Sequence, residues 1–214
     1  MKEFSKDTSQ TGFTDRLAYA NGLEKRAGFK RFLFFPGMLF ASRQKWWADG
    51  GLRPGLHEGL DFCFFEGAGG CRFRLDETAR VPAAFDSSVA AVIDDFLGRT
   101  VIAKQNLPGR TGQFFILYAH IRPDESVRPG QPLAAGRTFA AVAPAAQNRI
   151  LPPHLHLSVM PCEKMPSLEK LDWPLLNTLE SGSFLDPGDV TGCGGRVIDF
   201  HPGINLFDDF ARMG

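Results

Sequence analysis

The chain has 214 residues, of which 43% are hydrophobic, so it is long and apolar enough to bury the core of one good-sized domain. Its 24 lysines and arginines equal its 24 aspartates and glutamates, and the two signs are interspersed, which argues against a nucleic-acid-binding or membrane-surface protein. Twenty-three glycines and fifteen prolines are spread along the chain, which favours short strands joined by turns over a helical bundle.

The first 28 residues are polar and form a predicted N-terminal extension, with one short helix from Asp15 toward Arg26 that Gly28 would end. The stretch "KRFLFFPGMLFAS" follows, with basic residues before an apolar run. Because Pro36 and Gly37 interrupt this run and it is too short to span a bilayer, we expect a core strand with a turn, and neither a transmembrane segment nor a convincing signal peptide. By sequence the protein is expected to be soluble, with its compartment unknown.

From residue 29 to residue 190 the chain is a series of short apolar runs separated by glycine and proline. Their lengths and alternation are typical of half-buried strands, and the turns between them predict successive antiparallel hairpins. In "PSLEKLDWPLLNTLESG", leucines at near-helical spacing predict one or two short helices interrupted at Pro174. Residues 191–214 form a predicted C-terminal tail. The strand-like runs are "FKRFLFFP", "GLDFCFF", "CRFRL", "SVAAVIDDF", "RTVIAKQ", "GQFFILYAHI" and "HLHLSV".

The four cysteines show no CxxC spacing, so a structural zinc ribbon is not supported. A disulfide between Cys63 and Cys71 would close a Gly-rich turn, but free thiols are the expectation in a chain with no clear export signal.

Two segments carry histidines in patterns that suit a metal site. In "RPGLHEGLDF", a straight strand would place the Cα atoms of His57 and Asp61 roughly 13 Å apart, so the chain must bend between them to share an ion, and Gly59 permits such a bend. In "PPHLHLSV", alternation with leucine turns His154 and His156 to one face of a strand. The His…Asp spacing alone is more often structural, and HxH alone is ambiguous. Two histidines and a carboxylate together leave a fourth position for water, as in catalytic zinc sites.

Two other metalloenzyme classes fit these motifs less well. The H-E-x-x-H zincins require a helix and a second histidine where this chain has Asp61 in a strand context. Non-haem iron on a cupin-like β scaffold also uses two histidines and a carboxylate, but there the HxH motif comes first and here it comes last. Iron therefore stays a minor alternative. His120 ends the apolar run "FFILYAH", where it can reach a site, and His201 in the tail has no expected catalytic part.

Three segments in this order, "HEGLD", "LYAHIRP…VRPGQPLAAG" and "PPHLHLSV", resemble the hallmark segments of the lysostaphin/LytM-type zinc metalloendopeptidases, which are peptidoglycan hydrolases. The resemblance covers about residues 29–190. It implies an all-β fold in which an antiparallel sheet or sandwich of the lysostaphin/LytM (duplicated hybrid motif) type forms a groove, with short peripheral helices. It also implies a peptidoglycan stem peptide or cross-bridge as the substrate.

Carried over position by position, the resemblance makes His57, Asp61 and His156 the ligands of one zinc ion per chain. It makes His120 and His154 the catalytic pair, without deciding which of them is the general base. A rival from another functional class is a non-enzymatic LytM-like module that binds or activates a partner in cell-wall remodelling. Such degenerate relatives usually lack some of these residues, whereas this sequence keeps all five. A wall substrate implies the cell envelope.

Overall fold

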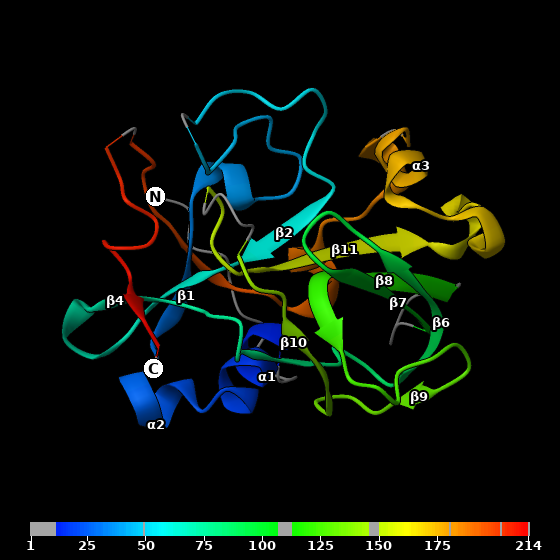
Figure 1. The fold of residues 1–214 in the computed structure, drawn as a ribbon, viewed down its shortest axis with the longest axis horizontal. Coiled ribbons are helices and arrows are strands. Elements are labelled where there is room, and N and C mark those ends of the chain that lie inside the picture. Colours follow the sequence, from blue (N-terminus) through cyan, green and yellow to red (C-terminus); the bar gives the residue numbers. More distant parts are fainter. Residues whose placement is uncertain are drawn as a thin grey trace.

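The computed structural model describes residues 12–48, 50–106, 113–145, 150–179, 181–201 and 203–213. Strands dominate these residues and form two sheets, while the helices are short and peripheral (Figure 1). The expected mostly antiparallel β architecture is therefore confirmed. Within the described residues, no helix is both long and apolar enough to cross a membrane.

The larger sheet carries the histidine motifs. Its strand order is β2-β11-β8-β7-β6-β9, and the pairings along this order are antiparallel, as the predicted hairpins require. At its margin β10 pairs with both β8 and β5. The strands are β2 Gly59–Phe62, β5 Arg80–Pro82, β6 Ser87–Asp94, β7 Arg99–Asn106, β8 Gln113–Pro123, β9 Pro132–Leu133, β10 Thr138–Val142 and β11 Leu155–Pro161.

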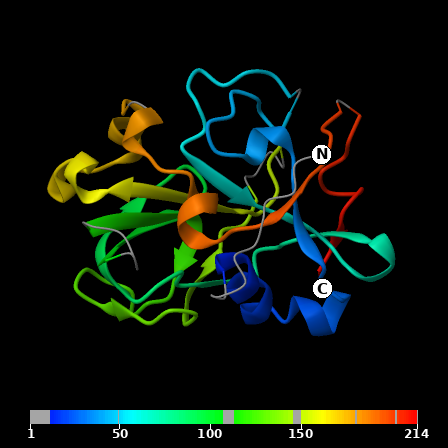
Figure 2. The same cartoon turned by 180° about the vertical axis from the view of Figure 1, so that it is seen from behind.

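The smaller sheet has the order β12-β1-β3-β4-β13. Its inner pairs are antiparallel, but β12 and β13 join their neighbours in parallel. Both of these outer strands come from the predicted C-terminal tail, and Figure 2 shows this segment, in red, beside the sheet. The strands are β1 Arg31–Phe34, β3 Phe64–Glu66, β4 Arg72–Arg74, β12 Gly195–Val197 and β13 Ala211–Arg212.

The described part of the N-terminal extension is helical and packed. It forms α1 (Phe13–Ala20) and α2 (Leu23–Ala27) instead of one helix, because Gly22 adopts a left-handed conformation with a φ of 59° between them. Gly28 ends α2 as predicted. Phe13 belongs to the same hydrophobic cluster as the buried residues of both sheets. The domain boundaries at residues 28 and 190 stay predictions, but described residues outside both boundaries pack on this shared core.

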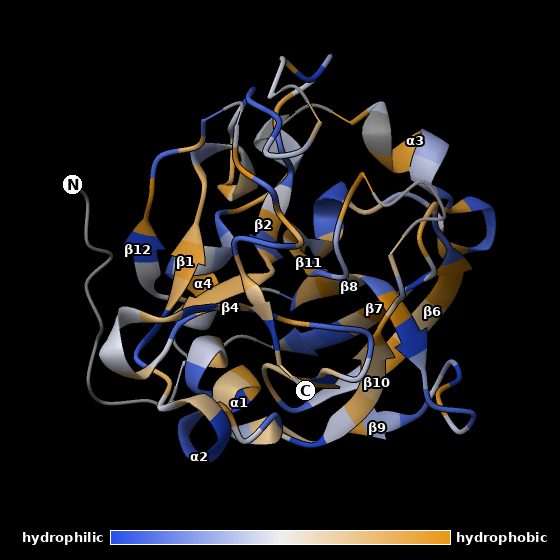
Figure 3. Ribbon diagram, turned by 60° about the vertical axis from the view of Figure 1, so that its left-hand side comes forward, coloured by the Kyte–Doolittle hydropathy of each residue, from blue (hydrophilic) through white to orange (hydrophobic). Residues whose placement is uncertain are grey.

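Alternation along β8 buries both faces of the larger sheet. Ile116 and Tyr118 contact the main core between the sheets, whereas Leu117 and Ala119 contact a second cluster on the opposite face. In Figure 3 the ribbon is coloured as hydrophobic along much of strands such as β1 and β6. Because both of its faces are covered, β8 is a rigid base for the groove described below.

The second cluster is covered by the segment from residue 162 to residue 184. The predicted helices are present there, but the predicted interruption at Pro174 is wrong. Pro174 lies in the first turn of α3 (Trp173–Asn177), where a missing backbone N–H is tolerated, and Asp172 caps this helix by accepting a hydrogen bond from the Leu175 N–H at 2.8 Å. The remaining helical turns are η1 Pro36–Met38, η2 Ala68–Gly70, η3 Cys162–Lys164, η4 Leu168–Lys170, η5 Ser181–Ser183 and α4 Pro187–Thr191.

The cysteines are free thiols, as expected. Cys63 and Cys193 are buried and Cys71 is exposed.

Candidate metal centre

A groove of about 510 Å³ lies on the larger sheet and contains all five residues that the sequence motifs singled out. They are His57, Asp61, His120, His154 and His156. The other lining residues come from the loop before β2, the hairpin after β6 and the segments before and after β11. They are Lys45, Trp47, Arg53, Pro54, Gly55, Leu56, Glu58, Phe96, Leu151, Trp173, Leu176, Leu179 and Phe184. The fifth histidine of the chain, His201 in the predicted C-terminal tail, is exposed and does not line this groove.

The pairing of β2, β11 and β8 brings the HEGLD, YAH and HLH segments together. Strand β11 lies between β2 and β8, and its residue His156 pairs with Asp61 on one side and with Ala119 on the other. His120 follows Ala119 directly, so the YAH segment reaches the groove at the same level. His154 lies immediately before β11 and is also buried in the groove. Both histidines of the HLH segment therefore face one site, as their alternation predicted.

The chain bends between His57 and Asp61, as expected. Their Nε2 and Oδ1 atoms are 3.3 Å apart, which a straight strand would not allow. Gly59 is required there for a different reason from the one expected, since its φ is not left-handed. A Cβ atom at Gly59 would collide with the carbonyl oxygen of Leu157 and approach Nε2 of His156 to 2.6 Å. Glycine thus lets β2 pack closely against β11 beneath the histidine ring.

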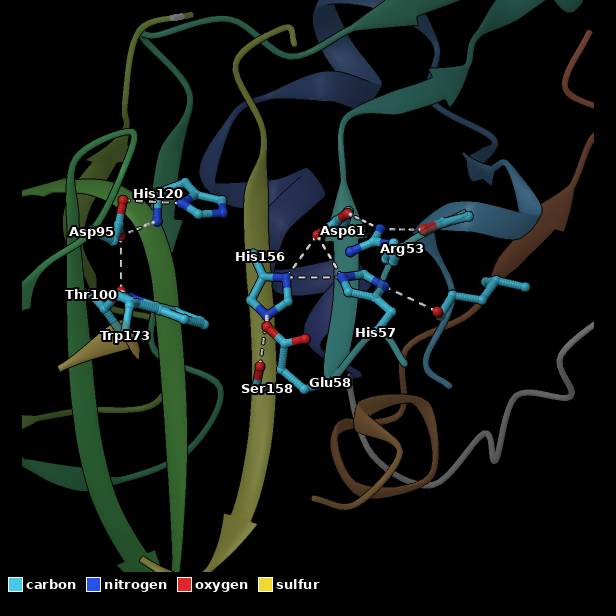
Figure 4. Close-up of polar contacts among 12 residues, drawn as sticks. Arg53, His57, Glu58, Asp61, Asp95, Thr100, His120, His156, Ser158 and Trp173 are labelled. Carbon is cyan, nitrogen blue, oxygen red and sulfur yellow. Dashed lines mark hydrogen bonds and ion pairs between the residues drawn. The ribbon is translucent and has the colours of Figure 1, made fainter. Parts of the chain in front are cut away.

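Three buried side chains converge to form a group that can hold a metal ion. Nε2 of His57 lies 3.1 Å from Nδ1 of His156, and Nδ1 of His156 lies 2.8 Å from Oδ1 of Asp61 (Figure 4). The three residues are each no more than 3% exposed. Separations of about 3 Å between donor atoms are what ligands about 2.1 Å from a common ion would have.

The hydrogen bonds around these residues suit a cation. Nδ1 of His57 lies 3.0 Å from the carbonyl oxygen of Leu39, and because a carbonyl only accepts, this nitrogen carries a proton and Nε2 is the nitrogen that faces the group. On His156, Nε2 is engaged with the hydroxyl of Ser158 at 2.7 Å, which leaves Nδ1 to face the group. Two imidazole nitrogens and a carboxylate oxygen then share one small space. A cation, or a proton on His156, is needed to offset their repulsion.

Asp61 is held in the ionised form despite its burial. Burial alone would raise its pKa, but the charge of His57 and hydrogen bonds from His156 and His57 bring the pKa well below the ordinary value. Its second oxygen, Oδ2, accepts the indole N–H of Trp46 at 2.6 Å and lies 3.8 Å from the guanidinium of Arg53. These contacts fix the carboxylate so that Oδ1 points at the histidines.

The pKa of His156 responds to the same neighbours. Burial lowers it, but the hydrogen bond and charge of Asp61 and the charge of Glu58 outweigh burial and raise the pKa above its ordinary value. In the metal-free protein His156 therefore tends to hold a proton at the place where a cation would bind. Metal binding at this group should release that proton.

His120 lies on the opposite side of the groove in an unusual conformation. Its φ is 60°, a left-handed conformation that costs a non-glycine residue on the order of 1–3 kcal/mol. Both its backbone N–H and its ring nitrogen Nδ1 contact the carboxylate of Asp95, at 2.9 and 3.1 Å. Burial tends to raise the pKa of Asp95, but the hydrogen bonds and charge of His120 and backbone hydrogen bonds hold it below the ordinary value. The ring of Phe96 packs edge-on against His120 at 4.5 Å.

His154 is a neutral imidazole. Burial, aided by the charge of His120, outweighs the charge of Asp61 and lowers its pKa to about 3. Its Nδ1 donates to the carbonyl oxygen of Pro152 at 2.9 Å, so Nε2 carries a lone pair. The ring packs edge-on against Trp46 at 5.2 Å and against His120 at 4.9 Å.

Sequence reasoning missed the residues that support these side chains. It gave no role to Trp46, and it did not identify Asp95, Thr100 or Trp173. Thr100 donates to Asp95 at 2.9 Å and accepts the indole N–H of Trp173 at 2.8 Å. The one available signal was the pair of aspartates before a glycine in "IDDFLG", which is typical of a side chain that closes a turn.

Comparison with known proteins identifies structural similarity only. No protein-family model and no curated protein sequence matches this chain. The structure is similar to the catalytic domain of the antimicrobial peptidase lysostaphin from Staphylococcus simulans, with 17% identity and a TM-score of 0.45 over 81% of this chain and 97% of that one.

Two longer lysostaphin structures give similar values. The antimicrobial peptidase from Staphylococcus simulans shows 16% identity and a TM-score of 0.42 over 72% of this chain and 53% of that one. An NMR solution structure of lysostaphin shows 18% identity and a TM-score of 0.39 over 65% and 53%. This chain spans about half the length of these two structures. The chemistry of the groove is therefore argued from its own side chains.

Proposed function

We propose that the protein is a zinc-dependent endopeptidase that cleaves peptide bonds in peptidoglycan stem peptides or cross-bridges. The observation that carries this proposal is the convergence of His57, Asp61 and His156 on one point, beside two further histidines that line the same groove. The motif resemblance supplies the substrate class. The five residues that the ordered motifs single out in the sequence are also the five that lie together in the groove.

The donor set fits zinc. Imidazole nitrogen and carboxylate oxygen are ordinary zinc ligands, and a site with three protein ligands keeps a position open for water or substrate. When bound there, zinc would lower the pKa of water toward 7 and polarise a carbonyl group. Non-haem iron also accepts two histidines and one carboxylate, so the metal identity is part of the proposal and not of the geometry.

The two remaining histidines can move protons at Nε2. In both His120 and His154 the Nδ1 atom is engaged by an acceptor, a carboxylate in one case and a carbonyl in the other, so Nε2 is the free nitrogen. A neutral Nε2 can take a proton from an attacking water and return it to the leaving amine. Because both rings are no more than 4% exposed, bulk water does not compete for these nitrogens.

The groove suits a short stretch of extended peptide. Its volume of about 510 Å³ lies within the usual range for a ligand site. Its lining includes charged side chains, Lys45, Arg53 and Glu58, and apolar ones such as Leu179 and Phe184. The lining therefore offers contacts for both polar and apolar groups of a peptide.

The test is release of new amino termini from purified peptidoglycan by zinc-loaded protein, with His120→Ala as the matched inactive variant. We expect amines with the parent only, loss of activity on complete chelation, and recovery on adding zinc. Mass spectrometry of the fragments would then identify the bond. Activity in a fully metal-free sample would refute the proposal. A zinc-loaded parent that releases no amines from any cross-linked substrate would favour the binding or activator module.

A further inference from the structure

We propose that Asp95 is the positioning residue that fixes His120 with Nε2 toward the groove and so makes His120, not His154, the proton acceptor. The catalytic meaning of this inference rests on the proposed function. Its structural content, the protonation of His120 at Nδ1, can be tested without any activity.

The Asp95 carboxylate makes more contacts than its turn requires. Its side chain is fully buried at the tip of the β6–β7 hairpin. Two contacts close the turn, from the N–H groups of Leu97 and Gly98 to Oδ1 at 2.9 and 2.8 Å. The others lead away from the turn, from the Thr100 hydroxyl and the His120 N–H to Oδ2 at 2.9 Å each, and from Nδ1 of His120 to Oδ1 at 3.1 Å. Asp95 thus joins the hairpin to β8 at His120 (Figure 4).

These contacts determine the tautomer of His120. An ionised carboxylate only accepts hydrogen bonds, so Nδ1 of His120 must carry a proton, and in the neutral ring Nε2 then carries the lone pair. The same carboxylate also binds the backbone N–H of His120, whose φ of 60° would otherwise be unfavourable. Asp95 therefore holds both the backbone and the ring of His120 in one orientation.

The partners of the two histidines differ in charge. When a histidine accepts a proton at Nε2, the ring becomes a cation, and a carboxylate at Nδ1 stabilises that cation more than a neutral carbonyl does. His120 has Asp95 at Nδ1, whereas His154 has the carbonyl of Pro152. The pair Asp95 and His120 is thus the better proton acceptor.

A further hydrogen bond links Asp95, through Thr100, to the groove-lining residue Trp173. The Trp173 indole N–H only donates, so the Thr100 oxygen accepts it at 2.8 Å and directs its own proton to Oδ2 of Asp95. The Trp173 ring lies nearly parallel to the His120 ring, at 24° and with 6.3 Å between centroids. The residue that directs Thr100 toward Asp95 therefore also lies beside the His120 ring.

The decisive variant is Asp95→Asn, with Asp94→Asn as its control. An asparagine amide has one acceptor oxygen and one donor NH₂ group, so in either orientation its NH₂ faces N–H groups that now bind a carboxylate. Asp94 is the neighbouring aspartate, but its side chain is 85% exposed and pairs only at the surface with Arg99 at 3.1 Å. The two variants make the same chemical change at adjacent positions.

With zinc-loaded protein, we expect Asp95→Asn to lower kcat by about 10²- to 10⁴-fold, the usual range for a general base, with KM within about threefold. Zinc stoichiometry should be unchanged, and Asp94→Asn should stay within about twofold of the parent. A kcat for Asp95→Asn within about threefold of the parent would overturn the inference, as would an equal loss in Asp94→Asn.

Nitrogen NMR of the zinc-loaded parent provides a test that does not depend on activity or on the folding of a variant. The inference predicts that His120 is protonated at Nδ1, and a finding of the Nε2-protonated tautomer would overturn it. If the parent cleaves no peptidoglycan, the proposed function fails, whereas the tautomer measurement still decides the role of Asp95. Thr100→Val should shift the His120 ring signals toward a mixture of tautomers and Thr100→Ser should not, and identical parental spectra for both would exclude the Trp173 link.

Discussion

Replacing Trp46 with phenylalanine is expected to weaken metal binding without removing any metal ligand. Trp46 is fully buried, and its indole N–H donates to Oδ2 of Asp61 at 2.6 Å. Phenylalanine keeps an aromatic ring near His154 and Phe64 but has no donor for the carboxylate. The change therefore tests whether the residue behind a ligand tunes the site.

The magnitude follows from the kind of hydrogen bond that is lost. A hydrogen bond to a charged group contributes about 1.5–3 kcal/mol, and each 1.4 kcal/mol corresponds to a tenfold change in affinity. The zinc affinity of Trp46→Phe should therefore fall by about 10- to 100-fold. Since the smaller ring also leaves space in the core, the free energy of unfolding of the metal-free protein should fall by about 1–3 kcal/mol.

The assay is competition for zinc against a chelator of known affinity, with circular dichroism and thermal unfolding to verify the fold. Trp47→Phe is the matched control, because Trp47 lies at the groove with Arg53 above its ring at 4.6 Å, and phenylalanine still offers a ring to that cation. We expect a near-parental zinc affinity for the control. A zinc affinity within about twofold of the parent for a folded Trp46→Phe would refute the reasoning.

Three further outcomes follow from the same geometry. Gly59→Ala should lower both the unfolding temperature and the zinc affinity, because its Cβ would collide with Leu157 and approach His156 to 2.6 Å, and a parental zinc titration would contradict this. In metal-free protein, the pKa of His154 is about 3 when folded and near 6.5 when unfolded. Burial of the neutral ring therefore carries no protonation cost above pH 6.5, and between pH 6.5 and pH 3 the free energy of unfolding should fall by up to about 1.4 kcal/mol per pH unit. Unfolding against pH should be flatter for His154→Asn. Zinc at 100 times its Kd should add about 2.7 kcal/mol and raise Tm by about 5–11 °C, and His57→Ala should remove this rise.

The strands and the grouping of the five motif residues in one groove could be predicted because they depend on local alternation and on short motifs. Every apolar run named from the sequence overlaps a strand of the structure, and the two histidines around Leu155 do reach one site. The bend between His57 and Asp61 was also predictable, since a shared ion requires it. The reason for Gly59 was not, because a clash with the His156 ring depends on the pairing of β2 with β11, which lies about 95 residues further along the chain.

The supporting residues could not be predicted for the same reason. Trp46 is 15 residues from Asp61 and Asp95 is 25 residues from His120, and no spacing rule relates either pair. Nothing in the local sequence distinguishes Trp46, which donates to Asp61, from the neighbouring Trp47, which lies at the groove. Only the folded loop shows which indole faces the carboxylate.

The buried carboxylates of Asp61, in the groove, and Asp95, behind His120, show why one suits a metal and the other does not. Asp61 offers Oδ1 to imidazole nitrogens that are themselves directed by other acceptors, so its neighbourhood has lone pairs in excess and needs a cation. Asp95 is surrounded by N–H and O–H donors, so its neighbourhood has protons in excess and has no lone pair left for an ion. The balance of donors and acceptors, more than the residue type, thus separates a ligand from a positioning carboxylate across one groove. Asp95→Asn should accordingly leave zinc affinity intact, while Asp61→Asn should remove it.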